Sequence, residues 1–279
     1  MITAGQKDYI EDHAYVPEHI LQYVTAVAQA EPFLVEDFLV YVKRDHLIFV
    51  GYPFVEPLEE KRMKVVLEEA TRRFRPETIS LTAPILPVFL DGHSHPPTDH
   101  YHRLDLSALS ISQKQRNMLN RAGRELFVEK SRNFDKEHSK MVDHFLKTHP
   151  VDEGTRFIFK RIGKYLSSSN TAWIFSARNN RGELIAFDIA DFYPKDYAIY
   201  MFNFRSASRH VPGASDLLLS EVIQQAKTER KKYVNLGLGI NPGVIFFKKK
   251  WGSEPFLSYT FYLYETSRKG NLDLLLQKL

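Results

Sequence analysis

The sequence predicts an α+β protein with a tandem architecture, in which two mixed sheets, each flanked by helices, follow one another along the chain. The order hairpin, helix, strand occurs first within residues 38 to 84 and again within 171 to 237. Apolar residues alternate in the strand segments but recur every three or four positions in the helical ones. A length of 279 residues with 43% hydrophobic content is enough for two half-sized cores. We expect halves at 1–110 and 131–279, joined by a basic helix at 111–130.

The first half contains the simpler version of this pattern. Residues 38 to 54, FLVYVKRDHLIFVGYPF, predict two strands around a polar turn, and TISLTAP (78 to 84) predicts another. Between them, residues 58 to 74 predict a helix whose apolar stripe consists of Met63, Val66, Leu67, Ala70 and Phe74.

The expected joining helix, 111–130, is amphipathic and basic. Its apolar stripe consists of Met118, Leu119, Ala122 and Leu126. The basic residues on the remaining surface are Lys114, Arg116, Arg121 and Arg124. Two further helices are predicted at 136–149 and 154–166.

The second half begins with a hairpin at 171–192 around the turn NNRG and continues with a strand at 196–204. A helix from Ser215 to about residue 231 leads to a strand at 233–237. Asn241 suits the N-cap of a short final helix, with Pro242 at its first position and Gly252 past its end.

Composition limits the classes of function. The chain has 38 Lys and Arg against 34 Asp and Glu, a formal charge of +4 that permits an anionic ligand without requiring one. It has no cysteine, which excludes disulfides, thiolate zinc sites and a cysteine nucleophile. Neither a signal peptide nor an apolar run of roughly 20 residues is evident, so we expect a cytoplasmic protein without a transmembrane segment.

The glycine-rich stretch NLGLGINPGVIFFKKKWG (235 to 252) does not match a nucleotide-binding motif. Gly237, Gly239 and Gly243 lie one residue out of register with the dinucleotide fingerprint, and no Gly-Lys-Ser/Thr sequence follows. In the helix that the stretch predicts, Lys248 lies beside the apolar arc that contains Trp251. Lys248 is therefore either partly enclosed and functional, or a surface lysine whose stem packs on apolar neighbours.

A candidate anion site lies at residues 204 to 226. A strand carrying Arg205 and Arg209 passes through a turn into the helix at Ser215, whose first N–H groups and positive dipole end suit a pyrophosphate. Asp216 in the first turn favours the opposite interpretation, that of an ordinary helix start.

The stretch DGHSHPPTDHYHRLDL contains four histidines, His93, His95, His100 and His102, near Asp91 and Asp99. Imidazole and carboxylate groups bind transition metals, but the prolines interrupt the spacing and no ligand-bearing helix follows. We interpret the stretch as a polar loop between the halves and predict no metal site.

Three of these segments resemble the GNAT superfamily of acyltransferases, and more narrowly its FemAB-like tandem branch, which includes the C-terminal domain of phosphatidylglycerol lysyltransferases. The family's pyrophosphate loop has Gln or Arg, then Gly three positions on, then Gly or Ala. In HVPGAS (210 to 215), Gly213 matches, while His210 and Ser215 depart from that pattern. The sequence FKKKWG (247 to 252) resembles the branch's segment of that type, and SQKQRNMLNRA (112 to 122) resembles its arginine-rich joining helix.

The resemblance implies transfer of an acyl or aminoacyl group to an amine acceptor. It implies no permanently bound cofactor, with a coenzyme A thioester or aminoacyl-tRNA as co-substrate and a lipid at a membrane surface as one possible acceptor. The donor would contact Arg205, Arg209, His210, Gly213, Ala214, Ser215 and Asn241. A tRNA would contact Lys114, Arg116, Arg121 and Arg124.

Such a reaction needs a base, an oxyanion donor and a proton for the leaving group. We predict Lys248, Asp188 and Tyr259 as the catalytic residues. Asp188 shares a strand face with small alanines and is alternatively a surface carboxylate, while Tyr259 and Tyr262 alternatively serve strand packing. The rival function is a non-catalytic module that binds an anionic partner. An open cleft beneath Gly213, lined by Lys248, would favour the enzyme.

Overall fold

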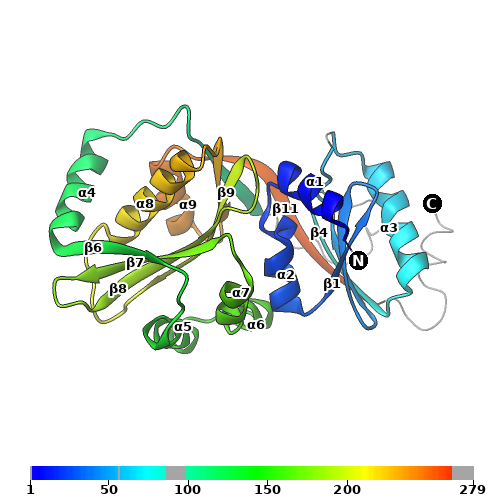
Figure 1. Ribbon diagram of the computed structural model, residues 1–279, viewed down its shortest axis with the longest axis horizontal. Helices are drawn as coiled ribbons and strands as arrows, with labels where there is room; N and C mark the ends of the chain where they lie inside the picture. Colours follow the sequence, from blue (N-terminus) through cyan, green and yellow to red (C-terminus); the bar gives the residue numbers. More distant parts are fainter. Residues whose placement is uncertain (1, 56, 86–98, 266–279) are drawn as a thin grey trace.

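The computed structural model describes residues 2–55, 57–85 and 99–265, and within these ranges the strands form one continuous sheet. Figure 1 shows an elongated molecule in which helices cover both faces of this sheet. The strand order is β1-β2-β3-β4-β11-β5-β10-β9-β8-β7-β6, with eleven strands in all. The α+β class is confirmed, but the expected division into two sheets is wrong.

The N-terminal half pairs its strands around one covering helix. Its helices are α1 (Ala4–His13), η1 (Pro17–His19), α2 (Leu21–Ala28) and α3 (Glu60–Phe74). Its strands are β1 (Glu31–Val35), β2 (Phe38–Lys43), β3 (His46–Val50) and β4 (Thr78–Ala83). The predicted stripe of α3 packs on the sheet, with Met63, Val66 and Ala70 fully buried. The helices before residue 30 lack a strong stripe and were not predicted.

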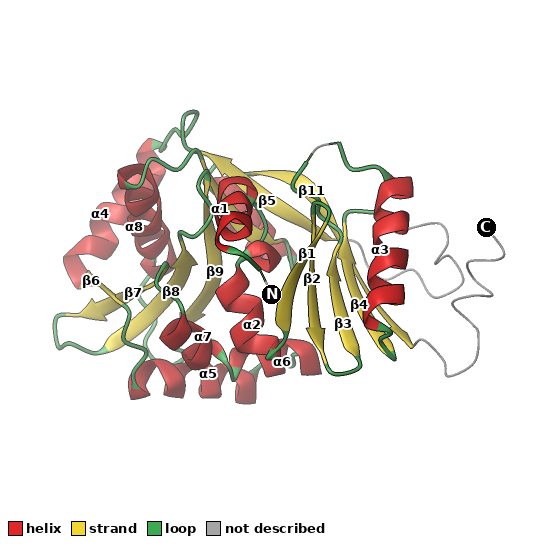
Figure 2. Cartoon of the chain, turned by 45° about the vertical axis from the view of Figure 1, so that its right-hand side comes forward, coloured by secondary structure: helices red, strands yellow, loops and turns green. Residues whose placement is uncertain are grey.

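The C-terminal half has helices on both faces of its strands (Figure 2). Its strands are β6 (Leu126–Ser131), β7 (Ala172–Asn179), β8 (Leu184–Asp191), β9 (Tyr197–Arg205) and β10 (Tyr233–Leu238). Its helices are α4 (Gln113–Glu125), α5 (Lys136–Thr148), α6 (Glu153–Phe159), α7 (Ile162–Ser168), α8 (Ala214–Thr228) and α9 (Pro242–Lys250). Every residue of β8 is buried, because α8 packs on one face and α5 and α7 pack on the other.

Two strands join the halves into one sheet. The long β11 (Glu254–Glu265) pairs with β4 through residues 260–265 and with β5 (Asp99–Asp105) through residues 254–259. Its twelve residues span about 40 Å when extended, enough to reach across both halves. In turn, β5 pairs with β10, so a strand that precedes the joining helix in sequence belongs to the C-terminal part of the sheet.

Three local predictions need correction. The histidine-rich stretch is not a loop throughout, because residues 99–105 form β5 and His102 is buried; His93, His95 and Asp91 lie outside the described residues. The joining helix ends at Glu125, where Leu126 begins a strand. Residues 154–166 form two short helices instead of one.

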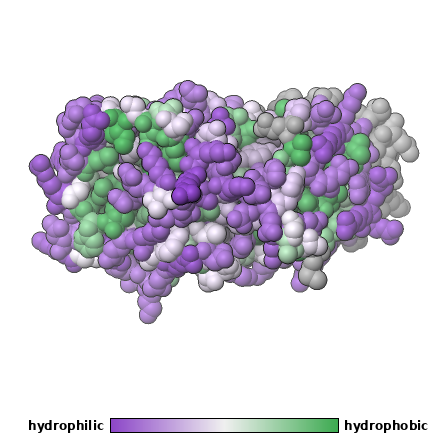
Figure 3. All heavy atoms as spheres, turned by 45° about the horizontal axis from the view of Figure 1, so that its top comes forward, coloured by the Kyte–Doolittle hydropathy of each residue, from purple (hydrophilic) through white to green (hydrophobic). Residues whose placement is uncertain are grey.

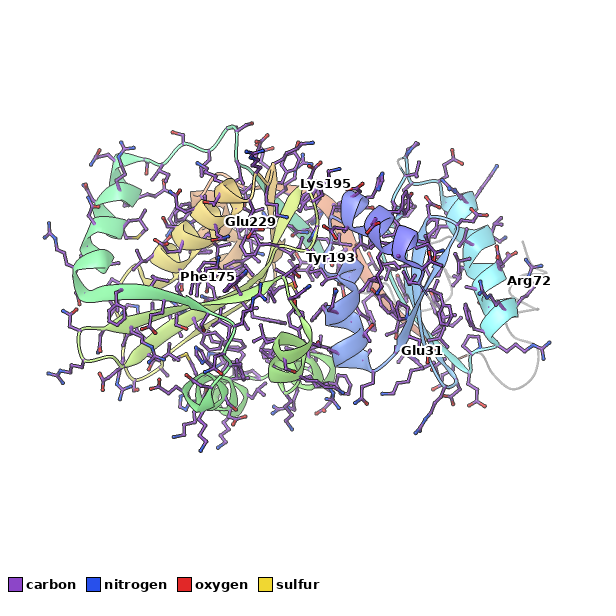
Figure 4. The ribbon with its side chains drawn as sticks, viewed as in Figure 1. Glu31, Arg72, Phe175, Tyr193, Lys195 and Glu229 are labelled. Carbon is purple, nitrogen blue, oxygen red and sulfur yellow. The ribbon has the colours of Figure 1, made fainter. Side chains whose placement is uncertain are left out.

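The N-terminal helices bind the two halves together. The Lys195 N–H donates to the Glu11 carbonyl at 2.9 Å, and the Lys195 ammonium pairs with Asp12 at 2.9 Å. Figure 4 shows Tyr193 and Lys195 where α1 meets the C-terminal half. Figure 3 shows a mainly hydrophilic face with scattered apolar patches. Among the described residues, each helix is too short or too polar to cross a membrane.

Candidate functional site

A cavity of about 480 Å³ opens between β9, the start of α8 and the whole of α9. Figure 1 shows α8 and α9 next to each other at this place. The cavity collects most of the residues that the sequence indicated: Arg205, His210, Gly213, Ala214, Ser215, Asn241 and Lys248. Four basic side chains line it, from Arg205, His210, Lys248 and Lys250, against the single carboxylate of Asp216.

A β-bulge in β9 shapes one wall of the cavity. The register between β8 and β9 shifts after the pair Ile189 and Phe202, so that Ala190 lies opposite Tyr200. The bulge inserts an extra residue and therefore allows Tyr200 and Asn203, which are three positions apart, to line the same cavity. Sequence reasoning missed both residues, since regular alternation would place them on opposite faces.

Asp188 lies in β8 directly behind this wall and is fully buried. The Asn203 side-chain N–H donates to Asp188 Oδ1 at 2.5 Å. Burial raises the pKa of Asp188 to about 7, against the stabilising contacts from Asn203 and Tyr200. Asp188 Oδ2 and the Tyr200 hydroxyl are both buried without a well-formed hydrogen bond among the described residues. Asp188 is therefore not the surface carboxylate of the alternative interpretation.

Lys248 lies on the opposite wall with only 4% of its surface exposed. Its ammonium donates to the backbone carbonyl of Leu238 in β10. Burial lowers the pKa of Lys248 to about 7, and Asp99 opposes this shift. Of the three consecutive lysines, Lys249 is exposed and Lys250 half-buried, as the helical phase predicted.

The loop between β10 and α9 is held by Asp99, which explains its glycines. The N–H groups of Gly239 and Ile240 donate to the two Asp99 carboxylate oxygens at 3.0 and 2.8 Å. A Cβ on Gly239 would lie 2.6 Å from Asp99 Oδ1, so only glycine fits. Asn241 then caps α9 by accepting from the Val244 N–H at 3.0 Å.

The start of α8 is shaped by α4. Gly213 is the N-cap with a left-handed φ of 84°, and a Cβ there would lie 3.0 Å from Met118 Cγ. The need for glycine at this position thus includes the close approach of α4. The carboxylate of Asp216 does not stand alone, because the Trp251 indole N–H donates to it at 2.9 Å and Lys250 pairs with it at 2.5 Å. These contacts offset the objection that Asp216 repels an anion at this helix start.

Two predicted residues lie outside the cavity lining. Arg209 pairs with Glu183 at 3.2 Å and lines a different hollow, beside α5. Tyr259 belongs to an aromatic cluster with the N-terminal helices, its ring 5.6 Å from that of Tyr101. The four basic residues of α4 are exposed, and none pairs with a carboxylate among the described residues. The same described residues hold no group of three or more metal-ligating side chains.

A second arrangement has the geometry of a nucleophile triad but no access to a substrate. His138 Nδ1 lies 2.8 Å from Asp135, and its Nε2 lies 2.9 Å from the Ser176 hydroxyl. His138 and Ser176 are each only 2% exposed, and the imidazole packs edge-on against Phe187. This network caps α5 and satisfies buried polar groups.

Comparison with known proteins shows the fold. No family model matches the sequence, and no curated protein matches it. The C-terminal domain of a putative lysylphosphatidylglycerol synthetase from Agrobacterium fabrum superposes with a TM-score of 0.59 at 15% identity, covering 98% of this chain and 94% of that one. FemX gives 0.64 at 11% identity, covering 100% and 99%. A tandem GNAT protein from the clavulanic acid biosynthesis pathway gives 0.53 at 13% identity, covering 83% and 79%. The chain has a FemAB-like GNAT fold.

Proposed function

We propose that this protein is an acyltransferase that moves an acyl or aminoacyl group from a donor in the cavity between α8 and α9 to an amine acceptor. One observation carries the proposal. Burial brings the pKa of Asp188 up to about 7 and the pKa of Lys248 down to about 7, at opposite walls of one cavity. A base and an acid that both titrate near neutral pH suit proton transfer at that pH.

The cavity suits a donor with phosphate groups. The first turn of α8 presents backbone N–H groups and a positive dipole end beside Ser215. Arg205 and His210 add positive charge at the same rim, and the Asp216 carboxylate is already paired. Both a coenzyme A thioester and the 3′ end of a tRNA offer phosphates to such a seat.

The surroundings favour aminoacyl-tRNA as the donor. Met118 of α4 approaches Gly213 at the cavity wall, so the exposed basic face of α4 continues from the cavity over the surface. An extended basic surface suits a polynucleotide backbone, whereas coenzyme A ends within the cavity. The fold shared with FemX and with a domain of a putative lysylphosphatidylglycerol synthetase agrees with this choice.

The chemistry follows from the positions of the side chains. The acceptor nitrogen attacks the acyl carbonyl carbon, forming a C–N bond and a tetrahedral oxyanion, which then expels the ribose oxygen of the donor. The Tyr200 hydroxyl faces the cavity and passes a proton to Asp188 as it takes one from the attacking nitrogen. Protonated Lys248 stabilises the oxyanion and supplies the proton for the leaving oxygen. No covalent enzyme intermediate is needed.

The open cavity also supports an enzyme over a module that only binds an anion, since it lies beneath Gly213 and is lined by Lys248. The test is a transfer assay with a mixture of charged tRNAs or acetyl-CoA as donor and a set of primary amines as acceptors. We expect amide formation from charged tRNA that requires both Lys248 and Asp188. Tight tRNA binding with no amide formed from any donor would overturn the acyltransferase proposal in favour of the module.

A further inference from the structure

The Glu18 carboxylate occupies an unusual position between the two halves. It follows Pro17 in η1, and the Tyr41 hydroxyl fixes its backbone by donating to the Glu18 carbonyl at 2.8 Å. The Tyr101 hydroxyl lies 2.9 Å from each carboxylate oxygen and donates to them. Burial raises the pKa of Glu18. Among the described residues, no Lys, Arg or His side chain pairs with this carboxylate, although the residue keeps partial exposure to solvent.

Aromatic rings surround the same carboxylate. The ring of Tyr101 is flanked edge-on by Tyr52, at 5.9 Å and 73°, and by Tyr259, at 5.6 Å and 83°. Tyr23 of α2 is close enough for its hydroxyl to interact electrostatically with Glu18. We call Glu18, Tyr23, Tyr52, Tyr101 and Tyr259 the Glu18 cage. One carboxylate among several aromatic faces is the arrangement that binds an ammonium group.

The Glu18 cage lies one strand away from the reactive cavity. Tyr101 in β5 is paired across the backbone with Leu238 in β10, and the Leu238 carbonyl accepts the hydrogen bond from Lys248. Strands β9 and β10 pair only through residues 197–199 and 233–235, so they separate beyond that point. Leu238 and Met201, both partly exposed, line this separation and pack against the aromatic cluster of the cage.

We propose that the Glu18 cage is the subsite for the acceptor, and that the acceptor carries a primary ammonium group that docks against the Glu18 carboxylate and the tyrosine rings. This inference rests on the proposed function and adds to it the chemical class of the second substrate. The donor enters from the α8 and α9 side, the acceptor from the side of the N-terminal helices, and the two meet where β9 and β10 separate. Tyr259, which the sequence suggested as a proton donor, serves here as a ring of the acceptor site.

The experiment measures binding of butylammonium to the full chain by saturation-transfer NMR, with butanol and butyrate as neutral and anionic probes. Butylammonium should bind, and Glu18→Gln, which keeps the shape and the contact with Tyr101, should weaken that binding at least about tenfold. Glu11→Gln, on the exposed surface of α1, is the matched control and should bind as the parent does. Tyr259→Leu removes one ring while leaving Glu18 in place, and it should weaken binding if Glu18→Gln does not fold.

The outcomes separate this inference from the proposed function. Equal binding of butanol, unchanged affinity in both cage variants, or no binding of butylammonium by the parent protein would overturn the cage. Lys248→Met should bind butylammonium normally, because Lys248 is not part of the cage. Normal butylammonium binding in a protein that transfers no acyl group to any amine would reject the acyltransferase and leave the ammonium site standing.

Discussion

Replacing Lys248 by methionine tests the proposed mechanism most directly, because the structure predicts opposite effects on stability and on activity. Lys248 is 4% exposed and has its pKa lowered to about 7 from 10.5 by burial. At neutral pH this difference corresponds to roughly 4 kcal/mol of destabilisation relative to the unfolded chain. Losing the hydrogen bond to the Leu238 carbonyl costs about 1.5 to 3 kcal/mol. Lys248→Met should therefore unfold at the same temperature as the parent or slightly above it.

The activity of the same variant should fall by about 10² to 10³, the typical loss when one oxyanion donor is removed from a partly dry site. The assay is the turnover number for amide formation, measured beside a thermal melt. Lys249→Met, which alters an exposed side chain of the same helix, is the matched control and should keep the parent's activity. Equal turnover in the two variants would remove Lys248 from the mechanism. A large loss of stability in Lys248→Met would show that its role is structural.

Three further predictions concern the base, the donor surface and the start of α8. Because the pKa of Asp188 is raised to about 7, the folded state keeps a proton that the unfolded chain releases near pH 4, and stability should fall as pH rises through that interval. Asp188→Asn should remove this slope in thermal melts and abolish turnover; an unchanged slope would contradict the assignment. In the double variant Arg116→Ala with Arg121→Ala, the log–log salt dependence of tRNA binding should lose somewhat under one unit for each phosphate contact, whereas a parental slope would assign both arginines to solvation. Gly213→Ala should lower the melting temperature more than Gly252→Ala, because both have a φ of 84° but only Gly213 faces a neighbouring helix, and equal losses would refute that explanation.

The sequence predicted local elements well because their signals are local. The stripe of α3, the hairpin around NNRG and the caps of α9 each depend on residues within one helix or turn. The single sheet could not be predicted, since it depends on which strands β5 and β11 pair with, and those partners are distant in sequence. The same limit applies to the cavity: Lys248 was found from its helical phase, but Tyr200 and Asn203 depend on a bulge that no periodicity reveals.

The exchange of strands between the halves has a consequence for function. If the halves were separate sheets, a hinge between them could change the distance from the Glu18 cage to Lys248. Instead, β5 carries Tyr101 and lies between β10, whose Leu238 carbonyl holds Lys248, and β11, which carries Tyr259. The acceptor cage and the donor cavity are thus fixed by backbone hydrogen bonds of one sheet. Since catalysis of a two-substrate transfer gains most from holding both reactants in attack geometry, a rigid sheet under both subsites supplies that positioning without domain closure.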